Sequence, residues 1–400
     1  MINCSQPKKA LYFEDINSIP KKIWEELDCA TNYYFNPKFL RALEKNNPQI
    51  SFFYVVLQDE GDKAIAFTTV QIIDFYIDDI ENNLKSILKK VTHFARKVKI
   101  IPKEKPLRIL ISGNSFVSGE HGIFIKENQQ KKKVIKKIAK AITQYTEKSP
   151  IYKNRIDLFI IKDFTKDSLN ITNELFDLNY YAFQIEPNMK LFFQKQWKDF
   201  DDYLASLKTK FRVKAKKAIS LSSGLEVIEV TDDNIVEFLP EITSLYKSVT
   251  SKSSFNLGSF DLRMYIDFKK HFKDSYFLKT FWLDKKMVGF MSGIMNQKNI
   301  DAHFVGIDYK FNRSHAIYQR MLYDYIDMGI KNKMNILNFG RTASEIKSSI
   351  GAFPEDLTIY IRHKKSVTNK ILKLFLLRIQ PSEFNQKFPF KAVKHSHENN

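Results

Sequence analysis

The stretch that begins at residue 281 changes from strand-like to helix-like spacing of its apolar residues. Three short apolar runs are bounded by polar turns, as is typical of neighbouring antiparallel strands, at residues 281–283, 287–295 and 300–308. Residues 313–331 then place apolar side chains at helical spacing, and a last apolar run, 336–339, leads into Gly-Arg-Thr. The pattern predicts three strands, a helix and a strand. A polar loop before such a helix suits an anionic group, because free backbone N–H groups point outward there.

The first half of the chain repeats this order of elements. Strand-like runs are found at residues 52–57, 64–73, 107–111 and 156–161, and helical spacing at 80–99 and 131–147. We therefore interpret the chain as two copies of one α/β unit. The expected domains are residues 1–190 and 191–365, followed by a tail, 366–400.

The clearest helical region is 197–224, and much of its surface is basic. Its apolar residues follow one helical face, at Leu204, Leu207, Phe211, Ala215 and Ala218. Six cations and no acid lie between residues 208 and 217, at Lys208, Lys210, Arg212, Lys214, Lys216 and Lys217. Like charges four residues apart repel by a few tenths of a kcal/mol per pair. This favours an anion lying against the helix, and the alternative is a solvated basic face.

Composition points to a globular chain with anionic partners. The chain has 400 residues, of which 44% are hydrophobic, and this excludes a disordered protein. The net charge of +19 favours nucleic acid, phosphorylated cofactors or an acidic membrane surface, and the alternative is a role in solubility. Cys4 and Cys29 lie in no cluster, so neither a disulfide framework nor a zinc site is expected. No signal-like or membrane-spanning run is present, and we expect a cytoplasmic protein.

The tail contains one compact apolar run, 371–379, which is too short to cross a bilayer. Cations surround this run, at Lys370, Lys373 and Arg378. Two interpretations remain open: a helix docked on the preceding domain, or a helix that makes peripheral contact with a membrane surface.

Three segments together resemble a known family. Residues 204–218 read L-x-x-L-x-x-K-F-R-x-x-x-K-K-A and precede Gly-Leu-Glu-Val, and residues 338–354 read N-F-G-R-T-A-S-E-I-K-x-x-x-G-A-x-P. Both resemble the FemAB-like branch of the GNAT acyltransferase superfamily. Residues 112–122, S-G-N-x-x-x-x-G-E-H-G, are similar to a segment of peptidoglycan biosynthesis/recognition proteins. The resemblance covers residues 30–365.

The resemblance implies a fold and a reaction. The fold is an α/β (α+β) arrangement of tandem GNAT-like domains, each a mixed, mostly antiparallel sheet flanked by helices. The reaction is transfer of an acyl or aminoacyl group to an amine, from acyl-CoA or aminoacyl-tRNA, with a cell-envelope precursor such as a peptidoglycan intermediate as one possible acceptor. CoA-binding members carry a glycine-rich loop after the fourth strand, whereas residues 308–316 contain no glycine. Backbone amides at 314–317 are the remaining phosphate contacts at the helix start.

Acyl transfer to an amine needs a base, stabilisation of the carbonyl oxygen and contact between the two reactants. The candidate catalytic residues are Asp308, His303 and Glu345. Each has a structural alternative: His303 suits the core of an apolar strand, Asp308 suits a helix cap, and Glu345 suits a cap or a pair with Lys347. The sequence shows no Ser/His/Asp order, Walker loop or metal-spaced cluster, so no metal is expected.

The binding residues are expected on both sides of the predicted helix. The donor is expected along Val305, Gly306, Asn312, Arg313 and Ser314. Substrate contacts are expected at Arg212, Lys216, Lys252, Phe255, Asn338, Gly340, Arg341 and Lys347. Arg341 and Lys347 are the best candidates for an anion, with salt bridges to Glu345 or Glu355 as the alternative. The rival to an enzyme is a non-catalytic module of the same fold that binds RNA or an anionic envelope component.

Overall fold

The computed structural model describes residues 9–75, 106–252, 260–376 and 383–391. The chain forms two compact units, and each unit collects three separate stretches. The first unit contains residues 1–186, 252–271 and 356–382, and the second contains 187–251, 272–355 and 383–400. The units therefore differ from the continuous domains expected from the sequence. The predicted helix at 80–99 lies outside the described residues, as does Cys4, while Cys29 is buried and unbonded.

The first unit is built on a sheet of eight strands among the described residues. The strands are β1 (Lys9–Phe13), β2 (Ser51–Gln58), β3 (Ala64–Phe75), β4 (Leu107–Ser112), β5 (Ile123–Ile125), β6 (Leu158–Phe164), β7 (Tyr181–Gln184) and β15 (Thr358–His363). The α-helices are α1 (Lys21–Leu27), α2 (Pro37–Asn46), α5 (Lys131–Lys148), α6 (Leu169–Thr172), α10 (Met264–Phe272) and α14 (Ser366–Leu376). Short 3-10 helices cover Ile16–Ser18, Tyr33–Phe35, Lys166–Ser168 and Asn173–Leu178. Apolar residues of α5 pack on the sheet to form the core of this unit.

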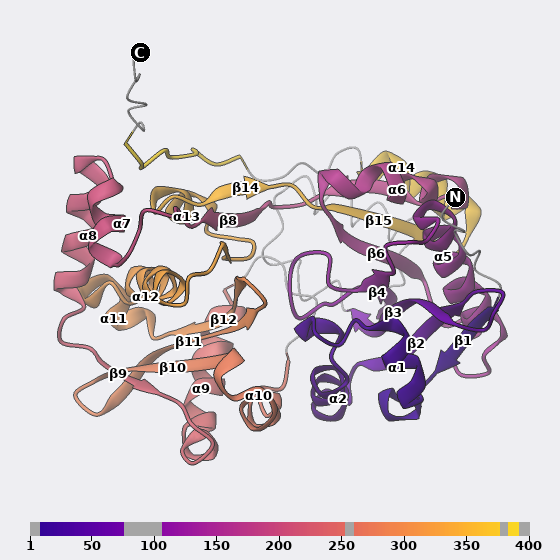
Figure 1. Ribbon diagram of the computed structural model, residues 1–400, viewed down its shortest axis with the longest axis horizontal. Coiled ribbons are helices and arrows are strands. Elements are labelled where there is room, and N and C mark those ends of the chain that lie inside the picture. Colours follow the sequence, from indigo (N-terminus) through magenta and orange to yellow (C-terminus); the bar gives the residue numbers. More distant parts are fainter. Residues whose placement is uncertain (1–8, 76–105, 253–259, 377–382, 392–400) are drawn as a thin grey trace. The chain divides into compact units, whose positions relative to one another are not determined.

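The second unit is built on a seven-stranded sheet in the part of the chain that the structure describes. The strands are β8 (Asn188–Phe192), β9 (Glu226–Glu229), β10 (Tyr276–Leu283), β11 (Lys286–Asn296), β12 (Asn299–Ile307), β13 (Ile336–Asn338) and β14 (Phe353–Glu355). The helices are α7 (Phe200–Ser206), α8 (Thr209–Leu221), α9 (Ile235–Thr250), α11 (Tyr309–His315), α12 (Ile317–Lys331) and α13 (Ser344–Ser349), with a 3-10 turn at Lys273–Ser275. Helices α9 and α12 lie on opposite sides of the sheet (Figure 1).

The two sheets follow the same path, which confirms the predicted pair of similar units. The first runs β1-β2-β3-β4-β6-β15-β7 and the second runs β9-β10-β11-β12-β13-β8-β14. In each, three antiparallel ladders are followed by one parallel ladder and then by two antiparallel ladders. The long helices also correspond, since α5 joins the parallel strands of the first sheet, as α11 and α12 do in the second. The α/β class expected from the alternation of elements is therefore correct.

The sixth strand of each sheet comes from the other half of the chain. Strand β7 ends in the first sheet, and the chain continues into β8, which lies between β13 and β14 of the second. Later, β14 ends in the second sheet, and the chain continues into β15, which lies between β6 and β7 of the first. Residues 180–193 are strand-like in sequence and are interrupted by Pro187, which predicts a crossing between the halves, but no sequence pattern predicts the second crossing. The exchange explains why neither unit is a continuous stretch.

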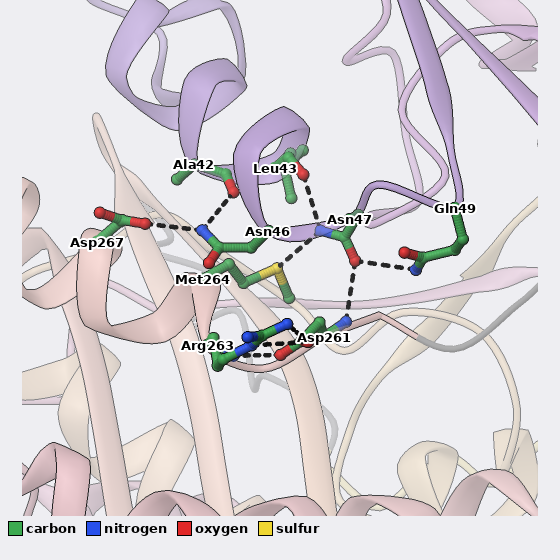
Figure 2. A network of polar contacts seen from close by, with 9 residues as sticks. All are labelled: Ala42, Leu43, Asn46, Asn47, Gln49, Asp261, Arg263, Met264 and Asp267. Atoms are coloured by element: carbon green, nitrogen blue, oxygen red, sulfur yellow. Dashed lines mark hydrogen bonds and ion pairs between the residues drawn. The ribbon is translucent and has the colours of Figure 1, made fainter.

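Helix α10 joins the first unit through a buried polar contact with the end of α2 (Figure 2). The side chain of Asn47 is fully buried; its Oδ1 accepts from the backbone N–H of Asp261 at 2.9 Å, and its Nδ2 donates to the carbonyl of Leu43 at 2.8 Å. Beside it, Asn46 Nδ2 donates to Asp267 Oδ2 at 2.7 Å. Hydrogen bonds to a buried amide are costly to lose. They therefore tie α10 to a unit that lies far from it in sequence.

Two helices predicted as continuous are each divided in the structure. The region 197–224 forms α7 and α8, because Leu207 and Lys208 are extended and pair with the C-terminal segment 383–391. The N–H of Lys208 donates to Pro389 O at 2.8 Å, so the helical ladder is interrupted there. The region 313–331 begins earlier, at Tyr309, and is divided at Ala316, whose φ of +47° is left-handed. Local spacing predicted both helical regions but not these interruptions.

Candidate active site

Strands β12 and β13 pair over only three residues and then separate. The parallel register joins Asn299, Ile300 and Asp301 to residues 336–338. Strand β12 continues to Ile307, and those further residues have no strand partner on the β13 side among the described residues. Backbone groups of an unpaired strand edge are free to pair with an extended ligand. The second sheet thus opens beside the start of α11, where the sequence predicted a donor.

A β-bulge bends β12 at this opening. Met291 pairs with Val305 and Gly293 pairs with Ala302, so Ser292 alone faces two residues, His303 and Phe304. The hydroxyl of Ser292 donates to Phe304 O at 2.9 Å and fixes the bulge. A bulge re-aims nearby side chains and increases the local twist. His303 is half-buried at this point of the strand.

A row of polar side chains crosses one face of the sheet at the opening. Ile300 and Leu337 point into the core, so the alternation of strand residues places Asp301 and Asn338 on the opposite face. Asn338 Nδ2 donates to Asp301 Oδ1 at 3.1 Å, and both side chains are buried. Across the next ladder Asn338 faces Lys190 of β8. This is the same face that α9 covers farther along β12, where the Tyr246 ring packs against Phe304.

Two asparagines in this row have unsatisfied amide atoms. Asn188 is fully buried, and neither its Oδ1 nor its Nδ2 has a hydrogen-bond partner among the described residues. Asn338 Oδ1 is also buried and without a hydrogen bond there. Each such group costs about 1–3 kcal/mol, and buried polar atoms in native proteins nearly always find a partner. The row is therefore suited to a ligand that offers both donors and acceptors.

The sequence predicted Asn338 but missed its neighbours. Asp301 is a lone acid inside an apolar strand run, and that departure from the pattern was the signal that could have identified it. Asn188 and Lys190 belong to a strand exchanged from the first half of the chain, and no local pattern predicts that it pairs beside β13. Lys190 Nζ lies 2.6 Å from Glu355 Oε2 of β14, so Glu355 pairs within the row.

Asp308 has the geometry of a helix cap. Its Oδ1 accepts from the N–H of Lys310 at 3.1 Å at the start of α11, and its Oδ2 lies 2.7 Å from Lys286 Nζ. The bond from Lys286 lowers the pKa of Asp308, and the bond from the Lys310 amide acts in the same direction. A carboxylate so engaged is a weak base. The structure thus favours the capping alternative over the catalytic one.

Helix α11 presents the predicted donor residues in different ways. Arg313 and Ser314 are exposed, and the Ser314 hydroxyl lies 2.9 Å from His315 Nδ1. Asn312 Oδ1 accepts from the N–H of Tyr318, so this side chain uses one of the free amides at the start of α12. Exposed Lys310 and Arg313 are cations that suit a phosphate. The positive charge at this position therefore comes from side chains, since the segment has no glycine-rich backbone loop.

Val305 and Gly306 of β12 point to opposite sides of the sheet. Val305 packs against the core cluster that contains α12, whereas Gly306 is buried against α9. A Cβ at Gly306 would lie 2.3 Å from Phe290 Cε1 and 2.7 Å from Leu245 Cβ. This glycine is thus required for packing between the sheet and α9.

Replacing Gly306 with alanine is expected to destabilise the second unit by about 1–3 kcal/mol, since the added methyl group overfills this contact. Gly340→Ala is the comparison, because a Cβ at Gly340 meets nothing within 4 Å. Its expected destabilisation is about 1–2 kcal/mol, because alanine disfavours the left-handed φ of +70° at this position. Urea unfolding measures both. Gly306→Ala with unchanged stability would contradict the packing role.

Lys347 lies beneath the loop that follows β13. Its side chain is buried, and Nζ donates to the carbonyls of Phe339, Gly340 and Arg341 at 2.8, 3.2 and 2.7 Å. The structure therefore uses Lys347 inside the fold and not as the exposed anion contact predicted from the sequence. Half-buried Arg341 is carried by this loop. Glu345 is exposed and pairs at 2.9 Å with Lys387 of the C-terminal segment, not with Lys347.

The remaining predicted contacts lie on other elements. Arg212 is half-buried and Lys216 is exposed, and both belong to α8, which packs beside α11 and α12. Lys252 is exposed at the end of α9, in the first compact unit, and Phe255 lies outside the described residues. The second unit thus places Asn338 beside β12 and places α8 beside α11, while Glu345 pairs with Lys387 and Lys347 is bound to loop carbonyls.

The described residues contain neither a metal-binding cluster nor a membrane-spanning helix. No group of His, Cys, Asp and Glu side chains within the described ranges has the arrangement of a metal site. Among the same residues, no helix is long and apolar enough to cross a membrane. Helix α14, which contains part of the predicted tail run, packs on β15 of the first unit.

Comparison with known proteins identifies the fold. No protein-family profile and no curated protein sequence matches the chain. Among solved structures it is similar to FemX, with a TM-score of 0.53 and 11% identity over 92% of this chain and 100% of that one. It is also similar to a tandem GNAT protein from the clavulanic acid biosynthesis pathway, with a TM-score of 0.51 and 8% identity over 89% and 98% of the two chains.

A third similar structure is the C-terminal domain of a putative lysylphosphatidylglycerol synthetase from Agrobacterium fabrum. Its TM-score is 0.50 and its identity 9%, over 89% of this chain and 95% of that one. The chain therefore shares the fold of FemX and of a tandem GNAT protein, as the resemblance of its sequence implied. At these identities the similarity concerns the fold, and the function is argued from the site.

Proposed function

We propose that the protein is an N-acyltransferase that moves an acyl or aminoacyl group to an amine acceptor. The observation that carries this proposal is the opening between β12 and β13 beside the buried pair Asp301 and Asn338. An opening in a sheet lets an extended acyl donor pair with strand backbone. FemX and the tandem GNAT protein share this fold, and this similarity supports the reaction class.

The donor in this proposal is an acyl-CoA or an aminoacyl-tRNA. Its anionic part lies against Lys310 and Arg313 of α11, and its acyl group enters the opening along β12. Backbone N–H groups of β12 beyond the paired residues are suited to stabilise the carbonyl oxygen as it becomes negative. The glycine-free loop makes the contact to phosphate depend on side-chain charge, which is weakened by salt.

The acceptor amine is placed on the polar face beside Asp301. Its carboxylate pairs with an ammonium group and is suited to take the proton that the amine must lose before it attacks. Asn338 orients that carboxylate, and the unsatisfied amides of Asn338 and Asn188 bind polar groups next to the amine. In this arrangement Asp301 takes the role that the sequence assigned to Asp308, and proximity supplies much of the rate.

Thermal-shift titration with acetyl-CoA, longer acyl-CoAs and tRNA tests the proposal. A CoA thioester is expected to raise the melting temperature, because a ligand that binds only the folded state stabilises it. Arg313→Ala is expected to remove most of this shift. Lys133→Ala, an exposed lysine of α5, is the matched control and is expected to leave it unchanged. Asp301→Asn is expected to keep the shift and lose acyl transfer to amines.

The rival reading is a non-catalytic module that binds RNA or an anionic envelope component. Its support is the absence of glycine from residues 308–316 together with the basic helix α8. Strongly salt-dependent RNA binding with no effect of any thioester would favour it and would refute the proposed transfer. Transfer that survives Asp301→Asn would refute the assigned base.

A further inference from the structure

The outer face of α8 combines cations with exposed aliphatic side chains. The helix packs on the second unit through Ala215 and Ala218, which are buried. Val213 is 60% exposed and Leu221 is 40% exposed. Val213 lies on the side away from the buried alanines and Leu221 lies on the flank one turn after Ala218, since a helix turns by about 100° per residue. Exposed apolar side chains set among cations on one side of a helix are a feature of helices that bind an interface.

The charges of this face are of one sign. Helix α8 contains no acid, and Lys210, Lys214 and Lys217 are exposed around Val213. None of these three lysines has a salt bridge within the described part of the chain. Other surface helices differ, because in α12 Arg320 and Lys331 pair with acids four residues away. The face therefore repels itself unless an anionic surface lies against it.

A lipid surface fits this combination better than RNA does. Single-stranded RNA is bound by cations together with aromatic side chains that stack on bases. The exposed apolar residues of α8 are aliphatic, and Phe211 is half-buried on the inner side. Aliphatic residues that enter a bilayer surface, with lysines that extend to the headgroups, are typical of interfacial helices. Anionic headgroups supply the complementary charge.

An exposed aromatic ring lies beside the first turn of α8. Phe388 of the C-terminal segment is 61% exposed, and its carbonyl accepts from Lys208 Nζ at 2.9 Å. Its ring packs near Phe353, which is 40% exposed, with ring centroids 6.3 Å apart. Aromatic rings are favoured at the boundary between water and lipid. A second exposed apolar group thus lies near the start of the helix.

We propose that the face of α8 formed by Lys210, Val213, Lys214, Lys217 and Leu221 docks the protein on an anionic lipid surface. This inference is independent of the proposed acyl transfer, because it concerns attachment and not chemistry. The sequence predicted a peripheral membrane contact through the tail, and this proposal assigns that contact to α8 instead.

Co-sedimentation of the full chain with lipid vesicles tests the docking. Vesicles of phosphatidylcholine mixed with phosphatidylglycerol are expected to bind the protein, and vesicles of phosphatidylcholine alone are not. The triple variant Lys210→Gln, Lys214→Gln, Lys217→Gln is expected to lower the partition coefficient on the order of 100-fold, since each lysine contributes about a factor of ten or less. Val213→Ser with Leu221→Ser is expected to lower it roughly tenfold. All these positions are exposed, so the fold is preserved.

The control keeps the same change in net charge elsewhere. Lys133→Gln, Lys140→Gln and Lys153→Gln remove three exposed cations from the first unit, and binding is expected to stay within about twofold. Equal loss in this control would overturn the proposal, because net charge alone would then explain binding. A second check replaces Val367 and Leu374, which are 74% and 63% exposed on α14, with serine. Loss of binding there, with none in the α8 variants, would place the contact on the tail and overturn the proposal.

RNA provides the last arm of the test. A single-stranded oligouridine that binds at physiological salt and is released by the α8 triple variant, while vesicles fail to bind, would overturn the lipid assignment. Vesicle binding that is lost in high salt and in the serine pair would support it, because both charge and apolar contact are then required.

Discussion

Replacing Lys347 with methionine is expected to lower the free energy of unfolding of the second unit by about 3–5 kcal/mol. The methionine keeps most of the apolar stem but leaves three backbone carbonyls without their charged donor. Hydrogen bonds to a charged group contribute about 1.5–3 kcal/mol each, and buried carbonyls that lose them remain desolvated. Urea unfolding followed by tryptophan fluorescence measures the change.

The loop above Lys347 explains why the loss is large. Thr342 and Ala343 have φ values of +66° and +50°, which residues with a Cβ rarely adopt. That backbone costs about 1–2 kcal/mol per residue, and Lys347 stabilises it from below. Lys331→Met is the matched control, because this exposed lysine pairs with Asp327 on the same helix, which is worth about 0.3–0.5 kcal/mol. A Lys347→Met variant as stable as this control would contradict the structural role.

The first half of the chain, produced alone as residues 1–186, is expected not to reach a cooperative fold. It lacks β15, which lies between β6 and β7 and pairs with both. It also lacks α10, so the buried amide of Asn47 loses its contact with Asp261. The fragment therefore exposes strand edges and apolar surface, and aggregation or dye binding without a sharp unfolding transition is expected.

Co-production of residues 1–186 with residues 187–400 is the control for this fragment. The second piece carries β15, so the two are expected to assemble and to unfold together in one transition. Calorimetry and size-exclusion chromatography measure both outcomes. A sharp, reversible transition of residues 1–186 alone would show that β15 is dispensable and would contradict the expectation.

Local patterns predicted the elements well and their connections poorly. The hairpin predicted at 281–295 and the strand β12 follow from short apolar runs and the turn residues between them. The division of the two long helices does not follow from local patterns. In the region 197–224, for example, Lys208 is held extended by a backbone hydrogen bond to Pro389, far away in sequence. Such contacts override helical propensity, and only the folded chain contains them.

The candidate site shows the same limit. A cation that follows the end of a strand is well placed to contact an anion. On this basis the sequence predicted Lys347 for that role. The structure instead points its side chain inward, where carbonyls are its partners. Asp301 was missed because a single acid in an apolar run gives no spacing to interpret. Its importance comes from Asn338 on the neighbouring strand, which is brought beside it only by the parallel pairing.

The exchange of β8 and β15 has a consequence for how such a gene can evolve. Each half of the duplicated sequence encodes a part that the other half needs, so neither is an independent unit that recombination can move into a new gene. Loss of one copy would remove an interior strand from the survivor. The two copies are therefore inherited together, and one is free to change its surface and its chemistry while remaining indispensable to the other as scaffold.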